Sequence, residues 1–266
     1  MTLILPTPAQ PLNIGTRGSP LALAQAYETR ARLAQAFDLP HEAFEIVIIK
    51  VTGDLIQDRA LKDIGGKGLF TREIEEALLA GSIDIAVHSM KDVETVRADI
   101  FDISAMLPRA DVRDRLIGAA SLDDLKHGAR VGTSSPRRAA QLQRARPDVQ
   151  IVPLRGNVAT RLAHIENGHA DATLLAAAGL DRLDMRNVGA PLPLSQFLPA
   201  ASQGAVGIDR LTSRNELVPF LAAINDVDTF AAVQAERALL EALGGNCHSP
   251  IAALAQVEGS QIRLKG

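Results

Sequence analysis

The chain has 266 residues, of which 47% are hydrophobic and 22% charged, and its formal net charge is −3. This length exceeds one typical domain and the composition is that of a globular protein, so we expect two or three domains with sizeable cores. The acidic balance disfavours general polyanion binding, and seven phenylalanines, one tyrosine and no tryptophan offer few surfaces for base stacking. We therefore expect no nucleic-acid partner.

The cysteine count and the lengths of the apolar runs indicate the cellular compartment of the protein. A single cysteine excludes an intramolecular disulfide framework and favours a reducing cytoplasm. The start, MTLILPTPAQ, lacks a basic leader with a long apolar segment, and no run approaches the ~18 apolar residues of a membrane helix. We expect a cytoplasmic protein with no membrane association. The six histidines are scattered, so we expect no metal site.

The first third of the chain alternates strand and helix patterns. LNIGTRGSPLALAQAYETRARLAQAF predicts a strand, a glycine turn and a helix, with Ser19 as N-cap and Pro20 at the first helical position. FEIVIIKV follows as a β-rich run, then TREIEEALLAG as an amphipathic helix capped by Thr71 and closed by Gly81. IDIAVHS is a buried strand. Such alternation predicts a parallel α/β sheet.

A second unit begins near residue 129. ARVGTSSPRRAAQLQRA repeats the earlier order of β-run, turn, Ser-Pro cap and helix, and VGTSSP at 131–136 matches IGTRGSP at 14–20. Two such openings predict two related α/β domains. Residues 187–209, rich in Pro, Gly and Ser, are interpreted as a return crossing.

The C-terminal part predicts a third, smaller unit. DTFAAVQAERALLEAL has a helical pattern, and IAALAQV and QIRLK are short runs that could pair as strands. We interpret the end at Gly266 as falling before this unit is complete. The expected domains are 1–107 with 204–224, then 108–203, then 225–266.

Arginines cluster in the second unit. Between residues 130 and 161 there are seven arginines and one acidic residue, which gives this segment a local charge of about +6. Arg137 and Arg138 fall at the second and third positions of a predicted helix, where cations oppose the helix dipole unless an anion docks there. Arg155 ends a β-run, and Asn157 can cap the helix that carries Arg161. The alternative is that these are solvated surface arginines.

Three further segments carry candidate chemistry. HSMKD places Ser89, Lys91 and Asp92 at a strand end, where Asp92 could act as acid–base group or form a structural salt link to Lys91. GGKGLF, with Lys67 and Phe70, lacks the nucleotide-binding spacing and suits a mobile loop bearing one cation. LGGNCHSPIA sets Cys247 in a turn where a thiolate could be reached, although an incidental cysteine is equally compatible.

These motifs together resemble the porphobilinogen deaminase (hydroxymethylbilane synthase) family. GTRGSPLALAQ, GGKGLF, DIAVHSMKDV, VGTSSPRR, LRGNVATRL, AAGLDRL, QGAVGI and the cysteine turn occur in that family's order, from about residue 13 to 257. The resemblance implies two α/β domains like type II periplasmic binding proteins, joined by crossing segments, and a small α+β third domain. It also implies a monomeric transferase of tetrapyrrole (haem) biosynthesis.

The resemblance further implies the chemistry and the site. Cys247 would carry a dipyrromethane primer through a thioether, onto which four porphobilinogen molecules are condensed with release of ammonia, before the linear tetrapyrrole is hydrolysed off. Asp92 would be the catalytic carboxylate, assisting protonation of the leaving amine and stabilising the cationic azafulvene and the pyrrole N–H groups. Acetate and propionate groups would be held by Arg17, Arg137, Arg138, Arg155, Arg161 and Arg182. The remaining contacts would be Ser19, Ser89, Lys91, Thr133, Ser135, Gly156, Asn157 and Gln203, with Lys67 and Phe70 on the mobile loop.

Three departures from the family pattern are visible. Glu94 stands where the family often has proline, Asn246 replaces a glycine before the cysteine, and the family's third domain usually continues further. Two other readings remain open: a non-catalytic two-lobed binder of a small polycarboxylate, and an inactive relative truncated in its third domain.

Overall fold

The structure is a computed structural model that describes residues 4–52, 71–246 and 249–266. Among these residues the chain divides into two units. The first comprises residues 4–52, 71–109 and 205–234, and the second comprises residues 110–204 with 235–246 and 249–266. The three domain boundaries expected from the sequence stay a prediction.

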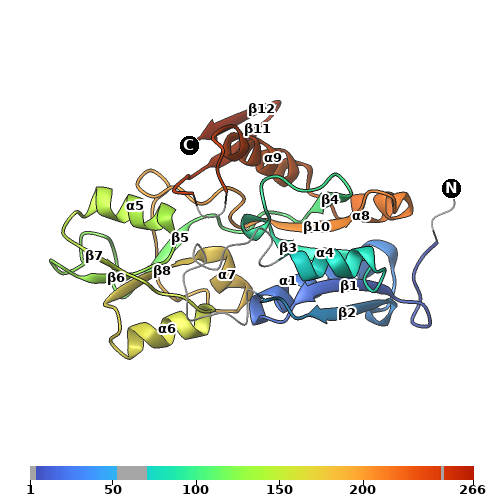
Figure 1. The fold of residues 1–266 in the computed structure, drawn as a ribbon, viewed down its shortest axis with the longest axis horizontal. Coiled ribbons are helices and arrows are strands. Elements are labelled where there is room, and N and C mark those ends of the chain that lie inside the picture. Colours follow the sequence, from blue (N-terminus) through green and yellow to red (C-terminus); the bar gives the residue numbers. More distant parts are fainter. Residues whose placement is uncertain (1–3, 53–70, 247–248) are drawn as a thin grey trace. The chain divides into compact units, whose positions relative to one another are not determined.

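The first unit is built on a five-stranded sheet of order β2-β1-β3-β10-β4 among the described residues (Figure 1). Strands β1, β2 and β3 are parallel, and β10 is antiparallel to both β3 and β4. The strands are β1 (Leu12–Arg17), β2 (Phe44–Ile49), β3 (Ile85–Ser89), β4 (Phe101–Met106) and β10 (Val206–Leu211). The helices are α1 (Pro20–Phe37), α4 (Arg72–Leu79), α8 (Val218–Ala222) and the beginning of α9 (Val227–Ala242), with 3-10 turns η1 (His41–Ala43), η2 (Met90–Asp92) and η3 (Asn215–Leu217).

Alternation along the strands gives this sheet two apolar faces. Ile85, Val87 and Ile208 point to the face covered by α1 and α8 and join one core there. Ala86 points to the opposite face and packs in a second core with Ile74 of α4. Burial on both faces explains why IDIAVHS is almost continuously apolar.

The second unit contains another five-stranded sheet, of order β7-β6-β8-β5-β9 in the described part of the chain. Strands β6, β7 and β8 are parallel, whereas β5 is antiparallel to β8 and to β9. The strands are β5 (Asp114–Ile117), β6 (Arg130–Gly132), β7 (Gln150–Val152), β8 (Ala172–Ala176) and β9 (Ala190–Pro191). The helices are α5 (Pro136–Ala145), α6 (Val158–Glu166) and α7 (Ala177–Arg182).

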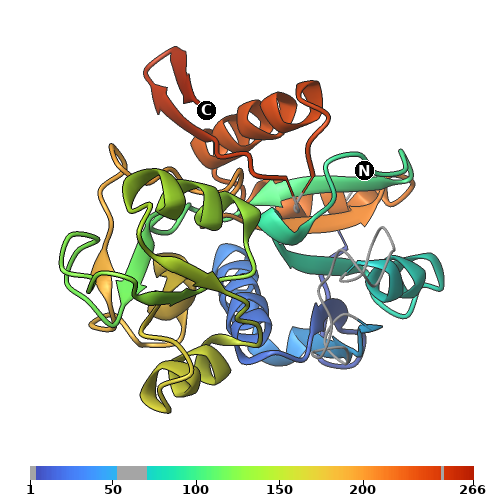
Figure 2. The ribbon, with the colours of Figure 1, turned by 60° about the vertical axis from the view of Figure 1, so that its left-hand side comes forward.

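The C-terminal segment follows α9 as a hairpin of β11 (Leu254–Glu258) and β12 (Gln261–Lys265), coloured red in Figure 2. The predicted pairing of these two runs is therefore confirmed. Leu240 of α9 packs with Ala253 and Ala201 in a small core of the second unit. The buried carboxylate of Glu236 accepts hydrogen bonds from the backbone N–H groups of Ser202 (2.6 Å) and Ala255 (2.7 Å).

Local chemistry explains most element starts, with two corrections. Ser19 caps α1 through its Oγ, which accepts from the N–H of Ala22 (3.3 Å), as predicted. Thr71 precedes α4 but makes no capping hydrogen bond through its side chain, which is buried. The sheets are mixed rather than purely parallel, because β10 and β5 each run against their neighbours.

Candidate functional site

The two sheets present polar side chains at the edge where their parallel strands end. In the first unit this edge carries Arg17 at the end of β1 and Ser89 at the end of β3. Carboxyl ends of parallel strands are the usual ligand-binding edge of α/β sheets. An antiparallel strand instead begins at this edge, so β10 and β5 bring the first residues of a strand to it.

Asp92 lies in the 3-10 turn η2 immediately after β3. Met90 is buried and fixes the turn, its N–H donating to the carbonyl of Ala205 (3.1 Å) while its own carbonyl accepts from the N–H of Val93 (3.2 Å). Lys91 and Asp92 are both half-buried. A carboxylate therefore stands on a well-anchored turn at the ligand-binding edge.

Ser89 has a partner that sequence reasoning missed. The side-chain amide of Gln25, buried on α1, donates to Ser89 Oγ (2.8 Å). Nothing in the helical pattern of α1 distinguishes Gln25 from a surface glutamine. Only its burial in the structure does so. The hydroxyl of Ser89 is thus fixed by a neighbouring helix.

In the second unit, four predicted residues lie at or just before the start of α5. Thr133 follows β6, and its Oγ1 accepts from the N–H of Ser135 (3.2 Å). Ser135 is the N-cap of α5, and its Oγ accepts from the N–H of Arg138 (3.4 Å). Arg137 and Arg138 occupy the second and third helical positions, as predicted.

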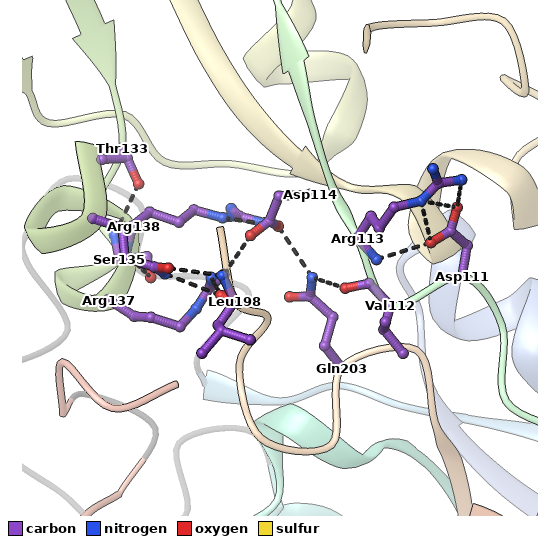
Figure 3. A network of polar contacts seen from close by, with 11 residues as sticks. Asp111, Val112, Arg113, Asp114, Thr133, Ser135, Arg137, Arg138, Leu198 and Gln203 are labelled. Atoms are coloured by element: carbon purple, nitrogen blue, oxygen red, sulfur yellow. Dashed lines mark hydrogen bonds and ion pairs between the residues drawn. The ribbon is translucent and has the colours of Figure 1, made fainter. Parts of the chain in front are cut away.

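The two arginines of α5 are not solvated, which corrects the alternative that they are surface arginines, and the proposed docking of an anion beside them stays a prediction. Both are buried, and Figure 3 shows their guanidinium groups directed at Asp114, the first residue of β5. Arg137 Nη2 pairs with Asp114 Oδ2 (2.7 Å), and Arg138 Nη2 pairs with Oδ1 (2.6 Å). Gln203 Nε2 donates to the same Oδ1 (3.1 Å) and to the carbonyl of Val112 (2.7 Å).

This network determines the charge state of its members. Burial alone would raise the pKa of Asp114, but the charges of Arg138 and Arg137 lower it from 3.8 to about 2. Burial also lowers the pKa of Arg137, against the opposing effect of Asp114. One carboxylate facing two guanidinium groups leaves a net positive charge, so the start of α5 can still attract an anion.

Arg155 is one of three arginines with a buried donor that makes no hydrogen bond among the described residues, together with Arg30 and Arg137. The Nη1 atom of Arg155 is buried and makes no hydrogen bond to the described part of the chain. The next residue, Gly156, has φ +103°, and a Cβ there would lie 2.7 Å from Thr160 Cγ2. Asn157 caps α6 through Oδ1, which accepts from the N–H of Thr160 (2.9 Å), as predicted. Arg161 Nε donates to the carbonyl of Gly156 (2.9 Å).

Of the remaining predicted residues, the structure describes Arg182, whereas three others lie outside its described part. Arg182, at the end of α7, donates through Nη1 to the carbonyl of Gly204 (3.4 Å). The predictions for Lys67, Phe70 and Cys247 concern residues outside those that the structure describes. Before the cysteine, Gly244 has φ +62°, and the carbonyl of Asn246 accepts from the N–H of Ser249 (3.0 Å).

Asp114 is the main functional residue that sequence reasoning missed. It sits in a segment, PRADVRDRL, where three arginines and two acids follow one another without helix or strand period. The sequence feature that could have identified Asp114 is an acidic residue at the first position of a short apolar strand. No group of three or more metal-ligating side chains occurs among the residues described, and none of the described helices is long and apolar enough to span a membrane.

Two mixed α/β sheets whose edges carry cations and a carboxylate define a class of protein suited to binding a small anionic molecule. Two sequence models match the chain: "Porphobilinogen deaminase, dipyromethane cofactor binding domain" over residues 12–218 and "Porphobilinogen deaminase, C-terminal domain" over residues 230–266. The porphobilinogen deaminase of Sphingopyxis alaskensis is 58% identical over 95% of this chain and 82% of its own length. That of Paracoccus denitrificans is 54% identical over 98% of this chain and 85% of its own length.

The chain therefore belongs to the porphobilinogen deaminase family, with hydroxymethylbilane synthase activity in tetrapyrrole biosynthesis and a dipyrromethane cofactor. The expected α/β class is confirmed: the described residues form two mixed α/β sheets, and residues 230–266 match the family's C-terminal domain. Among solved structures, the L-cystine solute receptor of Neisseria gonorrhoeae is 18% identical, with a TM-score of 0.40 and 88% of each chain covered.

Proposed function

We propose that Cys247 attaches the dipyrromethane cofactor, that Asp92 is the catalytic carboxylate, and that the arginines of both sheet edges hold acetate and propionate groups. Porphobilinogen is the substrate that family membership implies, and four molecules of it are condensed in turn with release of ammonia. We further propose a monomeric protein of the cytoplasm, in keeping with its single cysteine.

The residues present fit a cofactor with several carboxylates. Guanidinium groups bind carboxylates through paired hydrogen bonds, and six arginines stand among the proposed contacts. The buried, unpartnered Nη1 of Arg155 is the observation that carries this proposal, because a buried donor without a partner is costly unless a ligand satisfies it. When bound, the cofactor supplies the pyrrole to which the substrate carbon is joined.

Asp92 acts on the substrate as the amine leaves. Departure of ammonia from the aminomethyl carbon leaves positive charge on the pyrrole, and a carboxylate held near it stabilises that charge. The same carboxylate can accept a hydrogen bond from a pyrrole N–H. The anchored turn η2 supports this role, since electrostatic stabilisation requires a group that does not reorganise during the reaction.

The test compares Arg155→Leu with Arg130→Leu. Arg130 lies in the same unit, pairs with Asp171 and is exposed, so it is a matched control outside the proposed site. Loss of a charge-assisted hydrogen bond should raise KM for porphobilinogen about 10- to 100-fold in Arg155→Leu, or leave the protein without cofactor. The control should remain within about twofold of the wild type.

Intact mass and peptide mapping of residues 243–252 provide the second measurement. The wild type should carry a mass increment of two linked pyrroles on Cys247, and further increments should appear when porphobilinogen is added. An unmodified Cys247 in an active wild-type protein contradicts the attachment site. Equal KM and loading in both arginine variants contradict the carboxylate-binding role of Arg155.

A further inference from the structure

A buried carboxylate in the first unit has no part in the function proposed above. Asp209 lies in the middle of β10, is fully buried, and pairs with Ala86 of β3. The register between β10 and β4 shifts between Ile208 and Asp209. Such irregularities re-aim a side chain locally. Asp209 shares a sheet face with Ala86, which packs with α4.

Two side chains from either side of the Asp92 turn converge on one oxygen of Asp209. His88 Nε2, in β3, lies 3.5 Å from Asp209 Oδ2. Arg97 Nη2 forms an ion pair with the same Oδ2. Arg97 also pairs with Glu75 of α4 (Nη2–Oε1 3.1 Å) and lies over the ring of Phe101 at 5.2 Å.

His88 precedes Asp92 by four residues and Arg97 follows it by five. We propose that Asp209 is a positioning residue that holds the far end of the segment 89–96 through Arg97 and thereby fixes Asp92, while the near end is held by the pairing of β3 with β10. The inference rests on the proposed role of Asp92 and adds Asp209 and Arg97 to the residues on which turnover depends. Neither acts on the substrate directly.

The burial of the cluster makes it suitable for this task. The side chain of Arg97 is 10% exposed and that of His88 is 5% exposed. Burial alone would raise the pKa of Asp209, but His88 and Arg97 lower it below its ordinary value, so the carboxylate is charged at neutral pH. If Arg97 moved away, it would leave this buried charge uncompensated, which disfavours release of the segment.

The test uses Arg97→Gln in the holoenzyme, with Arg97→Lys as the conservative variant and Arg214→Gln as a matched control. Arg214 pairs with Asp84, which lies one residue before β3. The variant Arg214→Gln therefore removes an ion pair at the start of β3, whereas the segment 89–96 begins at the end of that strand. Turnover and hydrogen exchange of residues 89–97 are measured on each protein, together with Tm and the mass of the loaded cofactor.

Arg97→Gln should lower kcat about 10- to 100-fold with KM changed less than about twofold, because a misplaced catalytic group slows the chemical step more than binding. Exchange of residues 89–97 should become faster, and Arg97→Lys should recover most of kcat. Arg214→Gln should lower Tm without either effect. If Arg97→Gln folds poorly, Arg97→Leu combined with Asp209→Asn removes both charges and should show the same loss of kcat.

Two results would overturn the proposal. Unchanged exchange in residues 89–97 would mean that the ion pair does not hold the segment. Faster exchange with unchanged kcat would mean that holding the segment does not position a catalytic group. Asp92→Asn separates this failure from that of the proposed function: a large loss of turnover there retains Asp92 as catalytic and rejects only the positioning role.

Discussion

At the scale of single residues, Asp114 determines what the two arginines of α5 can do. Its carboxylate holds both guanidinium groups in fixed orientations while they remain charged, and Gln203 satisfies part of the remaining hydrogen-bonding capacity. Fixed side chains lose less conformational entropy when a ligand binds. We interpret Asp114 as an internal counter-ion that keeps one net positive charge available at the helix start.

The low pKa of Asp114 predicts an acid-sensitive contribution to stability. Its folded pKa of about 2 lies below the ordinary value of 3.8, so the stabilisation is complete above pH 3.8 and is lost as pH falls toward 2. The difference of nearly two pKa units corresponds to about 2 kcal/mol. Asp114→Asn should therefore be less stable than the wild type at pH 6, and the gap should narrow by about 2 kcal/mol between pH 5 and pH 2.

Urea unfolding at a series of pH values measures this gap. Asp184→Asn is the control, since that carboxylate lies in the same unit and is exposed. A gap between wild type and Asp114→Asn that stays constant down to pH 2 would show that Asp114 is not charged and paired as described.

At the scale of elements, the site is made from helix starts and from strands that run against their neighbours. Ser135 and Asn157 cap α5 and α6 at the ends of β6 and β7. The antiparallel β5 brings Asp114 beside Ala176, the last residue of β8. The helix starts supply only backbone N–H groups and arginines. The antiparallel strand β5 adds Asp114, the carboxylate that holds Arg137 and Arg138 in place.

The turn before α6 predicts a contrast between two glycines. Gly156 and Gly168 flank α6, and both have positive φ, but a Cβ would clash with Thr160 only at Gly156. Gly168→Ala should cost about 1 kcal/mol, from the left-handed backbone alone. Gly156→Ala should cost about 1–3 kcal/mol and should also raise KM, because Arg161 is held by the carbonyl of Gly156.

Thermal unfolding and steady-state kinetics on both variants test this contrast. Equal losses of stability and unchanged KM in both would show that the backbone at Gly156 tolerates a side chain and does not place Arg161.

At the scale of the whole molecule, one carboxylate contributes two of the hydrogen bonds that attach the C-terminal segment. Glu236 of α9 accepts from Ser202 ahead of β10 and from Ala255 in β11, so it fixes both the crossing segment and the hairpin. Cys247 lies in the sequence between α9 and β11. Glu236 therefore links the two elements that flank Cys247 in the chain.

Glu236→Gln should lower the free energy of unfolding by about 1–3 kcal/mol, because the amide NH₂ cannot accept from one of the two buried N–H groups. Exchange at Ser202 and Ala255 should become faster, and the fraction of protein carrying the cofactor on Cys247 should fall. The exposed Glu241→Gln on the same helix is the control. Unchanged exchange at both amides would contradict this attachment.

The sequence predicted many elements and much of the candidate site, for identifiable reasons. Ser19 with Pro20, Ser135 with Pro136, and Asn157 are local signals, since an N-cap and its helix are only a few residues apart. The paired hairpin strands are likewise neighbours in the chain. The antiparallel course of β10 could not be predicted, because its partners β3 and β4 lie more than 90 residues away.

The departure at Glu94 shows the same limit. Glu94 stands where the family often has proline, and the missing proline by itself favours a less rigid loop after Asp92. The ion pair of Arg97 with Asp209 supplies a constraint from another strand, 112 residues further along the chain. A local pattern cannot reveal such a constraint.

The sequence by itself determined the family, the order of strands and helices in each opening motif, and the residue types available for chemistry, because these depend on short-range patterns. Only the tertiary structure decided which charges meet. Arg137 and Arg138 face Asp114, and His88 and Arg97 face Asp209, because antiparallel strands from distant parts of the chain bring a carboxylate to each cluster. Electrostatic partners depend on distance in space, which sequence separation does not encode.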